Sequence, residues 1–265
     1  MSDYEHNSAA TARFGPAVGR AGSVAVDEGL RAYMLRIYNY MVLGLAITGV
    51  AALGTYLLSV TADPNLAALK LRDGLMLTAL GKALFVSPLK WAVIFAPLAL
   101  VFLLSFGLER MRPATAQIVF WIFAALMGVS LASIFMVFTH TSIVRVFFIT
   151  AASFGALSLW GYTTQRDLSG MGSFLLMGLF GVILASLVNL FMASSALQFA
   201  ISVVGVLVFA GLTAWDTQRL KSEYLYGAME GETAERSAII GALSLYLNFV
   251  NLFTLLLQLL GQRDE

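Results

Sequence analysis

The residues of this chain that could do chemistry are a few polar side chains placed in or beside long apolar segments. Near the end of one such segment, the stretch "GLTAWDTQRLK" carries a carboxylate at Asp216. Ionisable and amide groups are costly in hydrocarbon, so they are functional candidates wherever a sequence keeps them there. The others are Arg110, which follows an earlier apolar segment, and Asn248, Asn251 and Gln258 in the last one.

Asp216 has two interpretations. It could be an interfacial residue at the water boundary, because Arg219 and Lys221 follow it closely. Alternatively it faces inward and pairs with Arg110, since a guanidinium matches a carboxylate through two parallel hydrogen bonds. Arg110 could equally be a positively charged anchor at the membrane surface. The sequence leaves both alternatives open for each residue.

The amides of the last apolar segment share one helix face. Asn248 and Asn251 are three residues apart, which places them on the same side of a helix, and Gln258 extends that side. They could be hydrogen-bonding groups that hold helices together. They could also line a polar route through the protein, with Asn251 and Gln258 facing a pore.

The elements that must position these residues are membrane-spanning helices. The chain is 59% apolar and 12% charged, with a mean hydropathy of +0.84, which is far from a soluble domain. A span needs about 20 apolar residues, and the segments that qualify are Tyr38–Val60, Leu89–Leu108, Ala116–Phe138, Ile143–Gly161, Ser173–Phe191, Leu197–Trp215 and Ile239–Leu260. They are apolar on every face, which argues against a β-barrel. We predict an all-α integral membrane protein, a seven-transmembrane-helix bundle.

The remaining segments set the predicted domain boundaries and topology. Residues 1–29 are polar and rich in Gly, Ala and Ser, so we expect a disordered cytoplasmic tail before a transmembrane domain over residues 30–265. Lys and Arg are more numerous in the loops that would then be cytoplasmic, which favours N-terminus in and C-terminus out. The loop Thr61–Pro88 is either a solvated connector or a surface-lying amphipathic piece.

Small residues at helical spacing predict close packing of the helices. They are Gly44 with Thr48, Gly181 with Ala185, and Gly128. In a bilayer such residues let helix backbones approach closely, so a compact bundle is expected.

Two stretches resemble a known family. "WDTQRLK" at Trp215–Lys221 and "ALSLYLNFVNLF" at Ala242–Phe253 resemble the sixth and seventh helices of the Bax inhibitor, or transmembrane Bax-inhibitor-motif, family. "LERMRP" after the second span agrees, and the resemblance extends over about residues 35–261. It implies a cation leak pathway with calcium permeability. In that family an aspartate pair between helices six and seven forms a proton-sensitive latch near an arginine of helix two.

Carried over by position, the resemblance assigns the gate to Asp216, Arg110 and Asn248. Asn248 stands where the family has its second aspartate. Two contacting carboxylates share a proton because both cannot ionise cheaply. An asparagine is nearly isosteric with protonated aspartate and can donate to Asp216, so the pair imitates a permanently half-protonated latch. We expect a closed-biased pathway with a weaker pH response than the family pattern.

Other functions are disfavoured by what the sequence lacks. Lys90, at the very end of one predicted span, is the sole lysine in those spans, so none lies deep enough for a retinal Schiff base; cysteine is absent, and the two histidines, His6 and His140, do not form an HExxH motif. We therefore expect no enzyme, no cofactor and no nucleic-acid partner. Calcium would interact weakly, because a tight site takes about six to eight oxygens. The expected partners are the lipid bilayer and Ca²⁺ or another cation.

One alternative function stays open. The resemblance also allows a non-conducting membrane regulator that binds another membrane complex, such as an ATP-dependent membrane protease, with the tail as a flexible handle. For either function the expected location is the bacterial cytoplasmic (inner) membrane.

Overall fold

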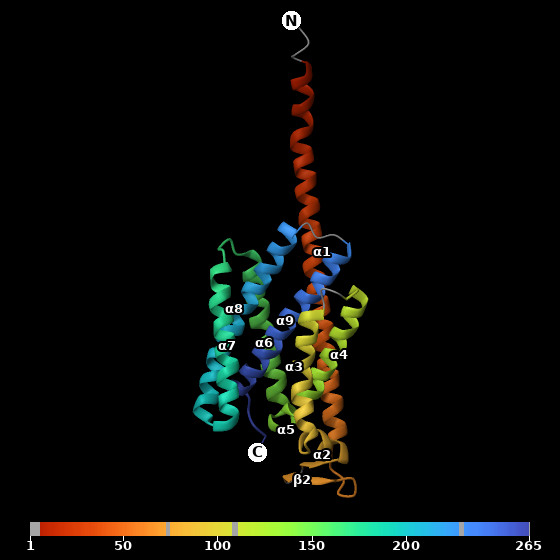
Figure 1. The fold of residues 1–265 in the computed structure, drawn as a ribbon, viewed down its shortest axis with the longest axis vertical. Coiled ribbons are helices and arrows are strands. Elements are labelled where there is room, and N and C mark those ends of the chain that lie inside the picture. Colours follow the sequence, from red (N-terminus) through yellow and green to blue (C-terminus); the bar gives the residue numbers. More distant parts are fainter. Residues whose placement is uncertain (1–5, 73–74, 108–110, 228–230, 265) are drawn as a thin grey trace.

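Helices standing side by side make up most of the molecule, as Figure 1 shows. The structure is a computed structural model that describes residues 6–72, 75–107, 111–227 and 231–264, with the backbone alone described for residues 6–27, 71–72, 103 and 105–106. The helices are α1 (His6–Ser59), α2 (Ala79–Phe85), α3 (Leu89–Gly107), α4 (Pro113–Leu131), α5 (Ile134–Val137), α6 (His140–Thr163), α7 (Ser169–Met192), α8 (Ser195–Gly227) and α9 (Gly231–Leu260). The strands are β1 (Val60–Thr61), β2 (Leu69–Arg72) and β3 (Leu75–Leu77).

Six stretches are each long and apolar enough to cross a membrane. They are Glu28–Ser59 of α1, Pro113–Val137, which joins α4 and α5, and the helices α6, α7, α8 and α9. The helices α2 and α3 meet at a bend of 61° and together give a seventh candidate. Helices suit this setting because hydrocarbon offers no hydrogen bonds to an unpaired backbone. The predicted all-α membrane fold is therefore observed, with six or seven spans. The predicted tail at residues 1–29 lies mostly where side chains are not described, so its disorder stays a prediction.

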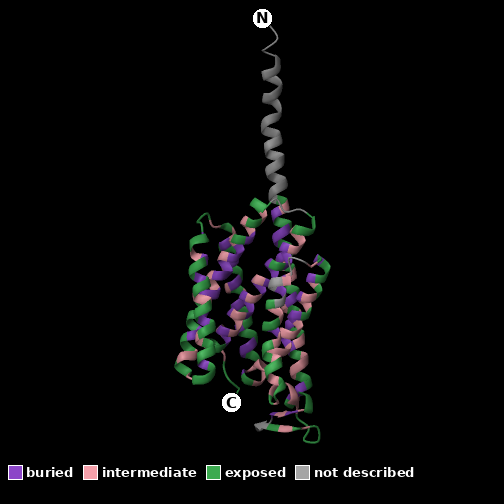
Figure 2. Cartoon of the chain, in the orientation of Figure 1, coloured by how far each residue is buried: buried purple, intermediate pink, exposed green. Residues whose placement is uncertain are grey.

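Helix α9 lies at the centre of the bundle. Among the candidate spans it has the largest buried share, and it packs against α1, α4, α6 and α8. Figure 2 shows buried residues concentrated on the inward sides of the helices. The fully buried Tyr246 of α9 meets Phe120 and Phe123 edge-on, with ring centroids 5.7 and 5.6 Å apart. Its hydroxyl lies 2.7 Å from Thr48 Oγ1, which ties α9 to α1.

Two glycines let neighbouring helices touch through their backbones. A Cβ on Gly128 of α4 would lie 2.4 Å from the Thr48 carbonyl oxygen of α1. One on Gly161 of α6 would lie 2.2 Å from the Ala214 carbonyl oxygen of α8. Close packing at Gly128 was expected from the sequence. Gly181 differs from the expectation, because nothing lies within 4 Å of the position a Cβ would take there, so it faces away from the other helices.

The loop after α1 contains a small sheet that the sequence did not predict. Its strands are antiparallel in the order β1-β3-β2, with Val60 and Leu69 both opposite Leu77. The short helix α2 follows, capped by the Thr78 side chain, which accepts a hydrogen bond from the Gly81 N–H. This segment thus contains a small sheet and a short helix, and its contact with solvent or with the membrane surface stays a prediction.

Candidate functional site

Asp216 lies in the interior of α8 rather than at the end of a helix. The predicted span ended at Trp215, but α8 continues to Gly227, 33 residues in all. At about 1.5 Å per residue the helix is about 50 Å long, well beyond a hydrocarbon core of about 30 Å. The polar residues after Asp216 therefore continue the helix into water instead of ending it. Asp216 is only 4% exposed.

The Asp216 carboxylate is held by donors from two helices. Its Oδ2 accepts hydrogen bonds from Asn248 Nδ2 at 2.7 Å and from Ser244 Oγ at 2.9 Å. Ser244 and Asn248 are four residues apart on α9, so they share one face of that helix. The other oxygen, Oδ1, lies 2.7 Å from the Arg219 Nη2 of its own helix. A buried charge is stable only when it is paired and hydrogen-bonded, and here both conditions are met.

Arg219 has a role beside Asp216 that the sequence analysis did not assign to it. We expected it to mark the water boundary, and its side chain is 42% exposed. It nevertheless turns back to the carboxylate three residues earlier and lies 5.1 Å from the centroid of the Trp215 ring. The predicted partner Arg110 lies outside the described residues. Ser244 was also missed, although its spacing of four residues before Asn248 was a usable signal.

A polar cavity of about 830 Å³ opens beside this carboxylate. It lies between the α6–α7 loop and the last turns of α8, and Arg219 lines it whereas Asp216 does not. Arg219 therefore contacts both the cavity and the buried carboxylate. Asp167 lies on the cavity rim, where hydrogen bonds from the Ser169 side chain and then from its backbone N–H lower the pKa of the Asp167 carboxyl.

The two predicted pore residues occupy different positions along α9. Asn251 is half-buried, and its Nδ2 donates to the Leu247 carbonyl oxygen of its own helix at 2.8 Å. Gln258 is exposed at the far end of α9, where its Oε1 accepts from Gln198 and, at 2.9 Å, from Ser202 of α8. Gln198 in turn accepts a hydrogen bond from Asn189 Nδ2 of α7 at 2.9 Å. The structure thus brings Asn248 to Asp216 and places Gln258 in a separate amide cluster.

An apolar section separates these two polar clusters. Between Asn248 and Gln258, the buried side chains of α9 include Leu252 and Leu255, which are 2% and 8% exposed. The polar Asn251 and Thr254 in this section hydrogen-bond to backbone carbonyls of α9 itself. Along α9, therefore, Asn251 and Thr254 bond within their own helix and join neither of the two polar clusters.

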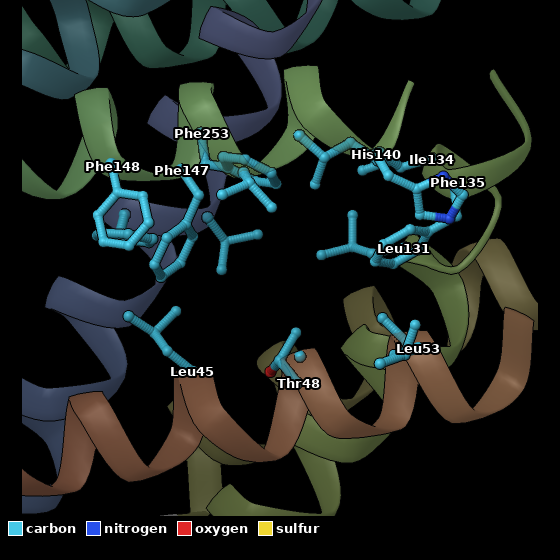
Figure 3. A pocket seen from close by; sticks show the side chains of 16 residues that line it. Leu45, Thr48, Leu53, Leu131, Ile134, Phe135, His140, Phe147, Phe148 and Phe253 are labelled. Atoms are coloured by element: carbon cyan, nitrogen blue, oxygen red, sulfur yellow. The ribbon is translucent and has the colours of Figure 1, made fainter. Parts of the chain in front are cut away.

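A second cavity of about 470 Å³ is apolar and lies among α1, α4, α5, α6 and α9. Figure 3 shows Leu45, Thr48 and Leu53 of α1 on one side of it and Phe147 and Phe148 of α6 on the other. We call it the His140 cavity, because His140 stands at one end. The centroid of the His140 ring lies 5.5 Å from the centroid of the Tyr56 ring and 5.7 Å from that of the Phe135 ring.

The lining of the His140 cavity holds no carboxylate or side-chain amide. Thr48 faces it, but its hydroxyl is already bonded to the Gly44 and Ala124 carbonyl oxygens. Within residues 6–72, 75–107, 111–227 and 231–264, no three His, Cys, Asp or Glu side chains cluster as a metal site would require. The carboxylate at Asp216 is therefore the stronger candidate for contact with a cation.

Comparison with known proteins gives consistent matches over nearly the whole chain. A family model described as inhibitor of apoptosis-promoting Bax1 matches residues 30–265. An uncharacterized protein of Rickettsia prowazekii is 46% identical over 239 residues, covering 90% of this chain and 93% of the relative. Inner membrane protein YbhL of Escherichia coli is 40% identical over 237 residues, covering 89% and 93%. An uncharacterized membrane protein of Streptococcus pyogenes is 34% identical, covering 90% and 96%.

Proposed function

The chain belongs to the Bax inhibitor family and is an integral protein of the inner membrane, and on that basis we propose that it conducts cations, Ca²⁺ among them, across this membrane. The observation that carries the proposal is the Asp216 carboxylate. It is buried between α8 and α9 and held by three donors, one of which, the half-exposed Arg219, also lines the polar cavity. Buried carboxylates in membrane helices are costly, and cation pathways are a principal use for them.

The proposal includes a topology. We propose seven spans, with α2 and α3 crossing as one bent unit, the N-terminus in the cytoplasm and the C-terminus outside. The polar cavity then faces the cytoplasm, and the amide cluster at Gln258 faces outward. Asn251 lies between them and would line the opened route.

The closed arrangement requires two changes before a cation can pass. Arg219 must leave Asp216 so that the cation replaces it as the counter-ion, and the exposed half of its side chain gives it room to move into the polar cavity. The helices must also move apart where the buried Leu252 and Leu255 of α9 pack.

Because Asn248 takes no part in proton exchange, we propose that the latch opens with little dependence on pH. A lone carboxylate binds Ca²⁺ weakly, which suits permeation. The proposed role is transport, without catalysis or a cofactor.

The test is calcium flux into proteoliposomes measured between about pH 6 and 8. We expect the wild type to conduct with a shallow pH dependence and Asp216→Asn to change the flux. Asn248→Asp should make the flux steeply pH-dependent, because it creates a proton-sharing carboxylate pair. Asn65→Asp is the matched control, since it makes the same chemical change in an exposed loop. A steep pH dependence that is present in the wild type and survives Asp216→Asn would refute the latch.

A second candidate is a non-conducting regulator of another membrane complex, such as an ATP-dependent membrane protease. The buried Leu252 and Leu255 favour it, because they lie between the two polar clusters of α9, where Asn251 and Thr254 bond only within their own helix. If no variant conducts above empty liposomes, this candidate replaces the first. Deleting residues 1–29 separates the two, because a pathway through the bundle would survive the deletion and an association made through the tail would not.

A further inference from the structure

Helices α1 and α6 form a seam with a cavity at each end. Both helices pack on α8 and α9, and the two are joined by the hydrogen bond between Tyr38 and Ser158. One cavity is the His140 cavity of Figure 3. The other, of about 610 Å³, we call the Arg31 cavity; Met41 of α1 lines it, one turn from Leu45 of the His140 cavity.

The Arg31 cavity combines a cation with a long apolar wall. Its lining includes the exposed Arg31, the tyrosines Tyr38 and Tyr162, and apolar side chains such as Met34, Leu35, Met41, Phe154 and Leu159. From Arg31 to Met41 the lining follows α1 for ten residues, about 15 Å along the helix axis. This length equals about half of a hydrocarbon core of about 30 Å, which is one leaflet.

The charge at the mouth of this cavity is positive and uncompensated among the described residues. The structure gives Arg31 no ion pair with any of them, Glu28 one turn earlier included. A second cation stands near the opposite wall, because Lys221 Nζ donates to the Tyr162 carbonyl oxygen at 2.9 Å and lies 5.2 Å from the Tyr162 ring centroid.

We propose that the Arg31 cavity binds an anionic phospholipid, with its phosphate on Arg31 and one acyl chain along the apolar wall. A guanidinium pairs with phosphate oxygens through two hydrogen bonds. Tyrosines prefer the headgroup level of a bilayer, where Tyr162 would flank the glycerol region. The His140 cavity provides the contrast, because no Lys or Arg lines it and it has no means of selecting an anionic headgroup.

The site also has a physical connection to the helix that carries Asp216. Ser158, on the cavity wall, bonds Tyr38 on one side and lies 2.9 Å from Thr217 Oγ1 on the other. Lipid binding is nevertheless a property of the cavity alone. It does not depend on whether the chain conducts, and it is measured without any flux.

The experiment titrates delipidated full-length protein with phosphatidylglycerol and, separately, phosphatidylcholine of the same chains, and counts bound lipids by native mass spectrometry. We expect the wild type to prefer phosphatidylglycerol. Arg31→Gln should weaken phosphatidylglycerol binding by about five- to tenfold, the effect of losing about one interfacial charge contact. It should leave phosphatidylcholine binding unchanged. Arg36→Gln is the matched control, because it removes the same charge from the same helix outside the cavity lining, and it should change neither.

Gly155→Phe tests the acyl-chain half of the site. No atom lies within 4 Å of a Cβ added at Gly155, so the new ring would enter the cavity rather than strike a helix. We expect it to abolish the tight phosphatidylglycerol site, and Gly155→Leu to weaken it. Three results would overturn the proposal: binding unaffected by Arg31→Gln, an equal loss in Arg36→Gln, or displacement of the lipid by millimolar inorganic phosphate with no effect of Gly155→Phe. The last result would identify a site for free anions.

Discussion

Replacing Asn248 with leucine removes one donor from the buried Asp216 carboxylate while nearly keeping the size of the side chain. The lost hydrogen bond is 2.7 Å long, and the two residues are 5% and 4% exposed, so water cannot replace it. A hydrogen bond to a charged group contributes about 1.5–3 kcal/mol. Ser244 remains as a half-buried donor, whereas Arg219 is half exposed and its ion pair is screened by solvent. We therefore expect Asn248→Leu to lower the free energy of unfolding by about 2 kcal/mol.

A double-mutant cycle with Asp216→Leu isolates this contact. When both partners become apolar, neither the buried carboxylate nor the amide is left without the other, and the loss of the Arg219 ion pair is common to both Asp216→Leu variants, so the double variant should be more stable than the sum of the single changes predicts. We expect a coupling of about 1.5 kcal/mol, measured by reversible unfolding in mixed micelles at pH 7. The control cycle pairs Asp216→Leu with Asn251→Leu, whose amide bonds to its own helix, and should be additive within about 0.5 kcal/mol. Additivity in the Asn248 cycle would refute the proposed hydrogen bond.

Three further predictions test the packing and the polar rim. Gly161→Ala should lower the free energy of unfolding by about 1–3 kcal/mol, because its Cβ would lie 2.2 Å from a backbone carbonyl oxygen of α8; Gly155→Ala, with open space around it, should be neutral or stabilising in the same thermal unfolding assay. Tyr246→Phe removes a hydroxyl 2.7 Å from a threonine of α1 and should cost about 1 kcal/mol in unfolding by denaturant. Ser169→Ala should raise the pKa of Asp167 toward 3.8 in an NMR titration, because the Ser169 hydroxyl is the largest cause that lowers it. A lowered pKa stabilises the folded state above the unfolded value of 3.8, and this stability is lost as the pH falls from 3.8 to the folded pKa; in the variant the loss should be smaller and should end at a higher pH.

The sequence predicted the helices well because span length and composition are local properties. Each apolar segment of about 20 residues corresponds to a helix, or, at Ala116–Phe138, to the successive helices α4 and α5, since no other backbone arrangement short of a closed barrel satisfies its hydrogen bonds in hydrocarbon. The ends of the helices were less predictable. Composition marks where the apolar residues stop, at Trp215 in α8, but nothing local marks where the backbone stops being helical, at Gly227.

The candidate site was predictable only in part. The position of Asp216 and Asn248 opposite each other was implied by a resemblance, and the structure brings the two side chains into contact. The roles of Ser244 and Arg219 depend on how α8 and α9 are rotated about their axes, which a single sequence does not state. The small sheet was missed for a related reason. Its strands have two to four residues, too few for a periodic pattern to stand out.

The central position of α9 has a consequence for how the protein is made. A ribosome delivers the chain from its N-terminus at about 5–20 residues per second, and α9 leaves it after all the helices that it packs against. Until then α1, α4, α6 and α8 are in the membrane without the helix that each of them packs against, and Asp216 is there without the two donors that α9 provides. Assembly of the core is therefore a late event in synthesis. A chain cut short before Gly231 would leave a carboxylate in the bilayer that membrane quality control could recognise.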